Sequence, residues 1–209
     1  MKIAFIGYGD LGRQVHALLL QTGSITEAIF FDDNLSPQKH ENVFPFETYQ
    51  DELYKNYSFI VSLGYKQLPA KKRIVQKLED LGRSLYSFIH PSCFVNPSAM
   101  IEKGVIAYPM CNIDKEVKIG KGVILNNSVT VSHNTVIGDC CYLSPGVILS
   151  GNVTSGEYTF FGTGAIVANN ISIGKNAVIG IGTVVTQDVA DNSSVIGNPM
   201  RVVNSLHLV

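Results

Sequence analysis

An unbroken six-residue period runs from Ile89 to Ala190, and it limits the possible folds more than any other feature of the sequence. The first position of each frame is apolar except at Ser155, and the fifth position is always small or β-branched. A period of six fits neither an amphipathic helix nor a simple alternating strand. The pattern instead predicts a short strand and a tight turn, repeated along the chain.

Glycine recurs at the second frame position, where we expect it to relax φ as the chain turns a corner. These second-position glycines are Gly120, Gly138, Gly156, Gly162, Gly174 and Gly180. Three frames would close a triangular coil of eighteen residues, and successive coils would stack at the strand spacing of about 4.8 Å. The sequence therefore predicts a parallel β-helix in which most repeat residues serve packing rather than chemistry. The spacing leaves its handedness open.

Composition excludes several other classes of protein. The 209 residues are 45% hydrophobic and 16% charged, which suits a globular chain of one large or two small domains. We find no apolar run long enough to span a membrane and no secretion signal, so we expect a cytoplasmic protein. A net charge of −1 gives no reason to expect a nucleic acid or a membrane as partner. The four cysteines show no CxxC spacing, so we expect free thiols and no metal site.

The residues before the repeat have a different pattern, which predicts an α/β unit. A short apolar run, 2–6, leads into a glycine turn, and helical spacing follows in residues 13–21. A strand, a glycine loop and a helix in this order suit a phosphate, because the helix N-terminus offers unpaired N–H groups to an anion. Within the turn, Gly7 would allow the change of direction and Gly9 would let the backbone approach a ligand.

Two further apolar runs, 28–31 and 58–63, predict the next strands of this unit. The turns after them carry the candidate ligand contacts Asp32, Asp33, Gly64 and Tyr65. A carboxylate after the second strand could accept a hydrogen bond from a ribose hydroxyl or a base. Only one βαβ half fits before the repeat, so a mononucleotide suits this unit better than NAD.

His133 stands out in the repeat because packing does not explain it. It occupies the third position of its frame, at an outward-facing corner of the predicted coil. An imidazole can accept a proton near neutral pH. Gly151, eighteen residues later, should lie one coil away, about 5 Å along the prism, where its N–H could meet a carbonyl or a developing oxyanion. A base beside an amide donor suits acyl transfer, although a surface histidine in a turn accounts for these two residues equally well.

The hexad run, the segment 131–139, the turns 144–146 and 150–153, and the segment 195–201 together resemble the left-handed β-helix acetyltransferases. With the small N-terminal unit, the chain is similar to the group that N-acetylates nucleotide-linked 4-amino sugars, such as the bacillosamine, perosamine and viosamine pathway enzymes. The resemblance implies homotrimers with acetyl-coenzyme A lying between neighbouring subunits. It also implies a direct transfer to the C4 amino group of a nucleoside-diphosphate-linked 4-amino-4,6-dideoxy sugar, for surface polysaccharide biosynthesis.

The same resemblance implies a division of the chain and roles for individual residues. Residues 1–86 would form a Rossmann-like nucleotide-sugar-binding subdomain, and residues 87–209 a left-handed parallel β-helix, the hexapeptide-repeat solenoid, with a C-terminal tail. The implied catalytic residues are His133 as the base, Asn134 and the Gly151 N–H, which would contact the thioester carbonyl. The implied coenzyme contacts are Gly151, Tyr142, Gly162, Gly180, Gly197 and Pro199. The implied contacts to the nucleotide-linked sugar are Gly7, Gly9, Asp32, Asp33, Gly64, Tyr65 and Asn126.

The chain departs from some relatives at two positions. Some carry an acidic residue directly after the catalytic histidine, where this sequence has Asn134, so a backbone carbonyl could orient the imidazole instead. Some carry a second histidine nine residues further on, where this sequence has Tyr142. Its hydroxyl could donate a hydrogen bond to the acetyl group, but it is too weakly acidic to replace a base near neutral pH.

Three other functions fit parts of the sequence. A sugar O-acetyltransferase of the sialic-acid type shares the scaffold, but a hydroxyl needs stronger deprotonation, which Asn134 disfavours. A non-catalytic repeat module would have no use for His133 beside Gly151. A nicotinamide oxidoreductase would need a second nucleotide-binding half. Uridine, thymidine and guanosine fit the N-terminal unit equally well, as do both configurations of the sugar at C4.

Overall fold

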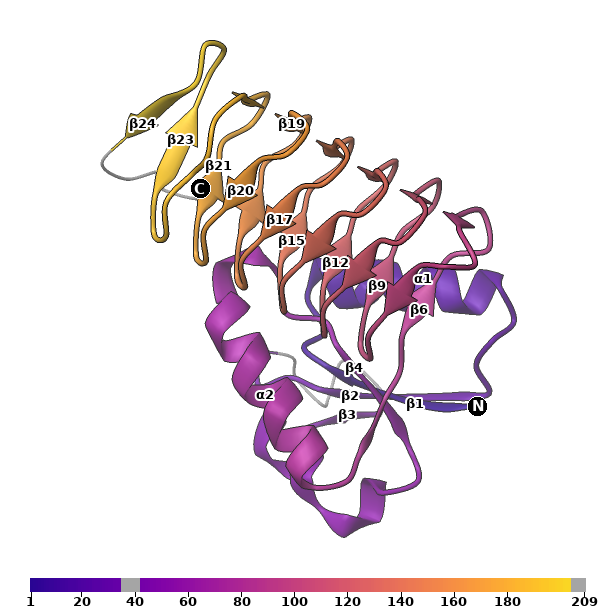
Figure 1. Cartoon of the computed structure of the whole chain (residues 1–209). Helices are drawn as coiled ribbons and strands as arrows, with labels where there is room; N and C mark the ends of the chain where they lie inside the picture. Colours follow the sequence, from indigo (N-terminus) through magenta and orange to yellow (C-terminus); the bar gives the residue numbers. More distant parts are fainter. Residues whose placement is uncertain (35–41, 204–209) are drawn as a thin grey trace. The chain divides into compact units, whose positions relative to one another are not determined.

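The computed structural model describes residues 1–34 and 42–203. The chain divides into two compact units, Met1–Ser87 and Phe88–Val209 (Figure 1). The end of the expected C-terminal tail, 204–209, lies outside the described residues. Among the described residues, no helix has the length and apolar character needed to cross a membrane.

The first unit is built on a parallel sheet with the strand order β3-β2-β1-β4-β5. The three apolar runs expected to be strands become β1, β2 and β4, and their side chains fill the centre of the unit. The helix expected after the glycine turn is α1, so β1, α1 and β2 form the predicted βαβ half. The elements are β1 (Lys2–Ile6), α1 (Asp10–Gln21), β2 (Glu27–Phe31), β3 (Val43–Phe44), three 3-10 turns (Phe46–Gln50, Glu52–Tyr54, Tyr65–Gln67), β4 (Ser58–Val61), α2 (Leu68–Asp80) and β5 (Ser84–Leu85).

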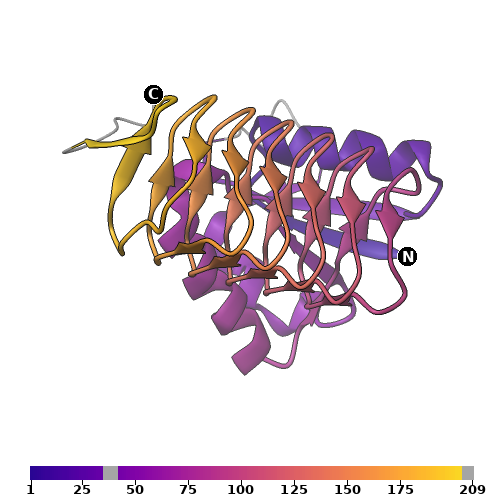
Figure 2. The ribbon, with the colours of Figure 1, turned by 45° about the horizontal axis from the view of Figure 1, so that its top comes forward.

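The second unit is a solenoid of two-residue strands, and strands eighteen residues apart pair in parallel and in register. Figures 1 and 2 show the successive coils stacked side by side. Its strands are β6 (Phe88–Ile89), β7 (Phe94–Val95), β8 (Met100–Ile101), β9 (Ile106–Ala107), β10 (Asn112–Ile113), β11 (Lys118–Ile119), β12 (Ile124–Leu125), β13 (Thr130–Val131), β14 (Val136–Ile137), β15 (Tyr142–Leu143), β16 (Ile148–Leu149), β17 (Thr154–Ser155), β18 (Phe160–Phe161), β19 (Ile166–Val167), β20 (Ser172–Ile173), β21 (Val178–Ile179), β22 (Val184–Val185), β23 (Ser194–Ile196) and β24 (Arg201–Val203). The eighteen-residue coil predicted from the period of six is confirmed.

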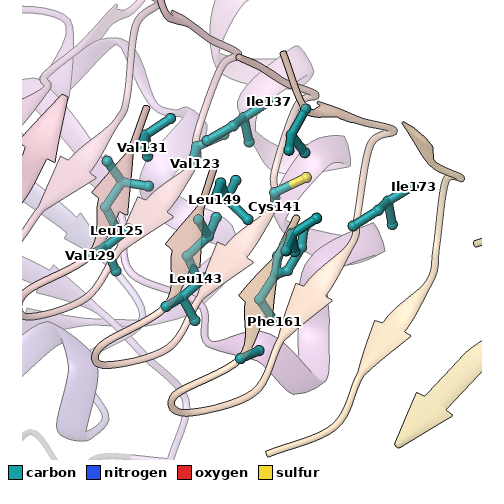
Figure 3. Close-up of a cluster of buried hydrophobic side chains, with 14 of the residues drawn as sticks. Val123, Leu125, Val129, Val131, Ile137, Cys141, Leu143, Leu149, Phe161 and Ile173 are labelled. Carbon is teal, nitrogen blue, oxygen red and sulfur yellow. The ribbon is translucent and has the colours of Figure 1, made fainter. Parts of the chain in front are cut away.

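The strands lie along three sides, which we name by one strand each. The β12 side has the order β24-β23-β21-β18-β15-β12-β9-β6, the β13 side β22-β19-β16-β13-β10-β7, and the β14 side β20-β17-β14-β11-β8. First-position and fifth-position residues meet inside the prism, as Figure 3 shows for Leu125, Val131 and Cys141. Ser155, the polar exception, is also buried, and its hydroxyl donates to the Gly156 carbonyl. The core is therefore filled by residues of the first and fifth positions, and side chains in the turns are the candidates for binding and catalysis.

The second-position glycines have a different role from the one expected. None of them has a positive φ, so the expectation of a relaxed φ is wrong. A Cβ on each would lie 2.3 to 2.7 Å from atoms of the next coil, so glycine is required by the close stacking of turns. The left-handed conformation occurs at the fourth frame position, where every residue from Gly104 to Gly182 has φ between 54° and 73°. Glu116 and Asn134 both occupy this position, one coil apart.

Candidate active site

His133 lies in the turn between β13 and β14, and its side chain is exposed. The turn is held by its neighbours on both sides. The Asn134 N–H donates to the Lys115 carbonyl at 2.9 Å, and the His133 carbonyl accepts from the Asn152 N–H at 3.0 Å. The backbone of the turn is bonded to the coils before and after it, so the backbone that carries the imidazole is held in place.

A chain of side-chain contacts leads from His133 to the preceding coil. His133 Nδ1 lies 3.0 Å from Asn134 Oδ1, and Asn134 Nδ2 donates to Glu116 Oε2 at 2.7 Å. Lys115 Nζ lies 3.4 Å from the other oxygen, Glu116 Oε1. The hydrogen bond from Asn134 and the nearby Lys115 lower the pKa of the Glu116 carboxyl, which favours its ionised form. The imidazole thus contacts the Asn134 side chain, where the sequence had suggested a backbone carbonyl as one way to orient it.

Residues eighteen apart lie one above another in a column along the solenoid. As this spacing predicts, Gly151 lies directly against the imidazole of His133. A Cβ at Gly151 would lie 2.5 Å from both Cε1 and Nε2 of His133, so only glycine leaves room for the ring in this position. The Gly151 N–H donates to Asn169 Oδ1 at 2.9 Å. The amide expected to meet a thioester carbonyl is therefore bonded to the next residue of its own column.

Asn126 and Tyr142 form a second cluster at another corner of the coil. Asn126 follows β12 and precedes β13, whereas His133 follows β13, so the two residues flank opposite ends of one side. Asn126 Nδ2 donates to the Tyr142 hydroxyl at 3.2 Å, and the Tyr142 ring stacks on Phe160 with 5.9 Å between centroids. One chain therefore does not bring Asn126 and Tyr142 to His133.

The glycines expected to contact the coenzyme have packing or hydrogen-bonding roles in this chain. Gly162 and Gly180 are second-position glycines, packed against the backbone of the next turn and the Ile196 side chain respectively. Gly197 has a φ of 90°, and its N–H donates to Thr183 Oγ1 at 3.1 Å. Pro199 follows it in the connection between β23 and β24, after a cis peptide bond.

In the first unit, the two carboxylates after β2 accept hydrogen bonds from backbone N–H groups, one of them in the glycine turn. The Tyr8 N–H donates to Asp32 Oδ2 at 2.7 Å, and the Phe46 N–H donates to Asp33 Oδ1 at 2.8 Å. Gly7 has a φ of 86°, the left-handed conformation that glycine adopts without strain. Gly9 and Gly64 both leave open space where a Cβ would stand, and Tyr65 begins the short turn after Gly64.

The sequence did not draw attention to an aromatic cluster beside this turn. The Tyr8 ring packs on Phe30 with 3.8 Å between centroids, and its hydroxyl lies 2.9 Å from His16 Nδ1. Phe5 packs against all three rings.

Burial lowers the pKa of the His16 imidazole, which predicts a pH-dependent stability. Below about pH 6.5 the unfolded chain binds a proton at this histidine that the folded chain resists, so acidification through that window favours unfolding. We expect His16→Gln to lose less stability than the wild type between about pH 7.5 and pH 5.5. Thermal midpoints of both proteins at the two pH values give the comparison, and equal losses would contradict the prediction.

All four cysteines are free, and the described residues hold no cluster of three metal-binding side chains. Cys140 and Cys141 are buried, although Cys140 lies in a turn. Burial raises the pKa of the Cys141 thiol to about 12. Because the thiolate is the nucleophilic form, this pair is poorly suited to accept an acyl group.

Comparisons with known proteins agree with this architecture. Residues 2–78 match the family described as the PglD N-terminal domain. The acetyltransferase domain of PglB from Neisseria gonorrhoeae, solved with acetyl coenzyme A, is 30% identical over 97% of this chain and 98% of its own, with a TM-score of 0.89. PerB from Caulobacter crescentus, solved with CoA and GDP-perosamine, is 29% identical over 98% of both chains, with a TM-score of 0.89.

A third structure, WeeI from Acinetobacter baumannii, is 25% identical over 97% of this chain and 100% of its own, with a TM-score of 0.87. A comparison with curated proteins found no match. The solved structures identify the second unit as a left-handed parallel β-helix, which the spacing of the repeat had left open. The similarity extends through both units of the chain.

Proposed function

Because the chain belongs to the hexapeptide-repeat sugar N-acetyltransferases, which use acetyl-coenzyme A, we propose that it acetylates the C4 amino group of a nucleoside-diphosphate-linked 4-amino-4,6-dideoxy sugar. The observation that carries the proposal is His133, an exposed imidazole held by Asn134 and packed against Gly151. Packing of the solenoid core does not explain the exposed histidine, and it is the imidazole ring itself that excludes a larger residue at Gly151. A base beside a backbone amide is the minimum that acyl transfer to an amine needs.

The proposed transfer is direct. The sugar amine attacks the thioester carbonyl carbon, the new C–N bond forms, and His133 Nε2 accepts the proton that the nitrogen loses. The C–S bond then breaks, and the thiolate leaves and is protonated. Much of the rate enhancement would come from alignment, because holding two reactants in the right geometry removes a large entropic barrier.

Gly151 is the proposed donor to the carbonyl oxygen, which gains negative charge as the amine adds. Its N–H now donates to Asn169 Oδ1, so the Asn169 side chain must turn away when the thioester binds. That exchange replaces one hydrogen bond of the amide with another. The Asn169 side chain would therefore keep the Gly151 N–H hydrogen-bonded until the substrate arrives.

Direct transfer is favoured over a covalent acetyl-enzyme because the two cysteines nearest in sequence to His133 are buried. The Cys141 thiol, with its raised pKa, gives little thiolate near neutral pH. A Cys140 or Cys141 route would first require the turn to open.

We also propose that the active site is completed in a homotrimer, with acetyl-coenzyme A between neighbouring solenoids. Support comes from the placement of Asn126 and Tyr142 at a corner different from that of His133. A site that uses both clusters needs a second copy of the chain. Gly162, Gly180 and Gly197, which have no side chain, would then contact the coenzyme through their backbone, and Pro199 would contact it beside Gly197.

The first unit is the proposed binding site for the nucleotide. Gly7 and Gly9 form the turn before α1, and Gly64 and Tyr65 form the turn after β4. Asp32 and Asp33 already accept backbone hydrogen bonds, so they would shape the loops and still have oxygens able to accept from a ligand. Nucleotide-linked sugars and acetyl-coenzyme A are cytoplasmic metabolites, and we expect a cytoplasmic step of surface polysaccharide biosynthesis.

Thiol release from acetyl-coenzyme A tests the acceptor class. We expect release with one or more 4-amino-4,6-dideoxy sugars linked to UDP, dTDP or GDP, and none with the same sugars carrying a hydroxyl at C4. The control is the enzyme without acceptor, which measures thioester hydrolysis. A response to sialic acid alone would make the chain an O-acetyltransferase, and isolation of an acetylated enzyme without acceptor would overturn the direct route.

A further inference from the structure

We propose that Glu116 is a positioning residue, which acts through Asn134 to hold His133 in the tautomer that leaves Nε2 unprotonated. The proposal rests on the proposed role of His133 as the base. It assigns a function to a carboxylate on the preceding coil, which is linked to His133 by hydrogen bonds through the Asn134 amide.

The first step concerns the orientation of the Asn134 amide. An ionised carboxylate can only accept hydrogen bonds, so Glu116 Oε2 at 2.7 Å requires the Asn134 NH₂ group. The pKa of Glu116 is lowered by that hydrogen bond and by Lys115, so the carboxylate persists at neutral pH. The Asn134 carbonyl oxygen must then point toward the imidazole. Glu116 therefore decides which end of the amide His133 meets.

The second step concerns the proton on the imidazole. Asn134 Oδ1 is an acceptor only, so His133 Nδ1, at 3.0 Å, must carry the hydrogen. In the neutral ring the other nitrogen, Nε2, then has a free lone pair. Nε2 is also the ring nitrogen nearest the position that a Cβ on Gly151 would occupy, 2.5 Å away compared with 3.1 Å for Nδ1. The unprotonated nitrogen is thus the ring nitrogen that lies nearer to Gly151.

The third step concerns how rigidly the two residues are held. Glu116 and Asn134 have nearly identical left-handed backbones, with φ of 57° and 58°, at equivalent positions of adjacent coils. The Glu116 N–H donates to Ser98 Oγ at 2.9 Å, which ties its turn to the coil before it. Two charged groups lie near the chain of contacts from Glu116 through Asn134 to His133. They are Lys115, beside Glu116 Oε1, and Asp114, whose carboxylate accepts from the Lys115 N–H. The backbone turns that carry Glu116 and Asn134 are therefore held in register.

Two substitutions at Glu116 separate hydrogen bonding from folding. Glu116→Ala removes the acceptor, lets the Asn134 amide turn over, and should lower kcat about tenfold with the KM for acetyl-coenzyme A within about twofold. Glu116→Gln has an oxygen that can accept from Asn134 Nδ2 but also an NH₂ group that can donate to Asn134 Oδ1, so it should restore the rate only in part. Asn192→Ala is the matched control, because Asn192 also has a left-handed φ and accepts from an amide, Asn176 Nδ2, at another corner. It should leave kcat unchanged.

The tautomer itself can be measured by NMR on ¹⁵N-histidine-labelled protein at about pH 8, where histidine is neutral. The His133 signals are those missing from His133→Ala. We expect the Nδ1–H tautomer in the wild type, a larger share of the Nε2–H form in Glu116→Gln, and the largest share in Glu116→Ala. An Nδ1–H tautomer and an unchanged kcat in Glu116→Ala would overturn the proposal while leaving His133 as the base. If instead His133→Ala keeps its activity, the proposed function fails, and the tautomer measurement still decides whether Glu116 orients the ring.

Discussion

Replacing His133 with alanine should lower kcat by about 10²- to 10⁴-fold, the usual contribution of a general base. The amine must lose a proton as it forms the amide bond, and the described residues around Gly151 offer no second imidazole to accept it. The binding of acetyl-coenzyme A should persist, because His133 lies in an exposed turn whose backbone bonds do not involve the side chain. The expected signature is a fall in kcat with little change in KM for the coenzyme.

His90→Ala is the control for this experiment. His90 is also a turn histidine of the solenoid, where its Nδ1 lies 2.8 Å from Ser92 Oγ, and it has no role in the proposed transfer. Steady-state kinetics and calorimetric titration with coenzyme A compare the two variants. Near-normal turnover in His133→Ala would remove His133 from the mechanism, and an equal loss in His90→Ala would point to damage of the solenoid instead.

The fold could be predicted from the sequence because the solenoid is nearly one-dimensional. Each coil contacts mainly its neighbours, so a fixed period assigns every residue between Ile89 and Ala190 to a side, a corner and a column. The eighteen-residue spacing also predicts that His133 lies against Gly151, and the structure has them in contact. Handedness could not be predicted this way, since the period is the same for either hand.

The interactions within the site were less predictable, because a column fixes backbone positions but not rotamers. Glu116 and Asn134 are eighteen residues apart, which shows that they are neighbours but not that the amide bridges to His133. Asn169 lies in the same column, yet the sequence does not show that its side chain bonds to the Gly151 N–H. The role of the second-position glycines was also misjudged, since φ is a local property and their constraint comes from the next coil.

Gly151→Ala should lower kcat about 10²-fold while leaving the fold nearly as stable as the wild type. The new Cβ would lie 2.5 Å from Cε1 and Nε2 of His133, so the imidazole must swing away. A ring at the end of an exposed side chain can move at little cost in folding free energy. A displacement of about 1 Å at a reacting group is nevertheless enough to cost about two orders of magnitude in rate.

Gly138→Ala is the same substitution at a position where the new Cβ would meet backbone atoms, which cannot swing aside as a side chain can. Its Cβ would lie 2.6 Å from the Glu157 nitrogen and 2.7 Å from the Gly156 carbonyl carbon, both backbone atoms of the next coil. We expect it to destabilise the chain by about 1–3 kcal/mol, the usual cost of overpacking, whereas Gly151→Ala should cost less than about 1 kcal/mol. Chemical denaturation and kcat, measured on both variants, separate the two effects. If Gly151→Ala were as unstable as Gly138→Ala, or fully active, the contact between Gly151 and His133 would be a feature of packing and not of the active site.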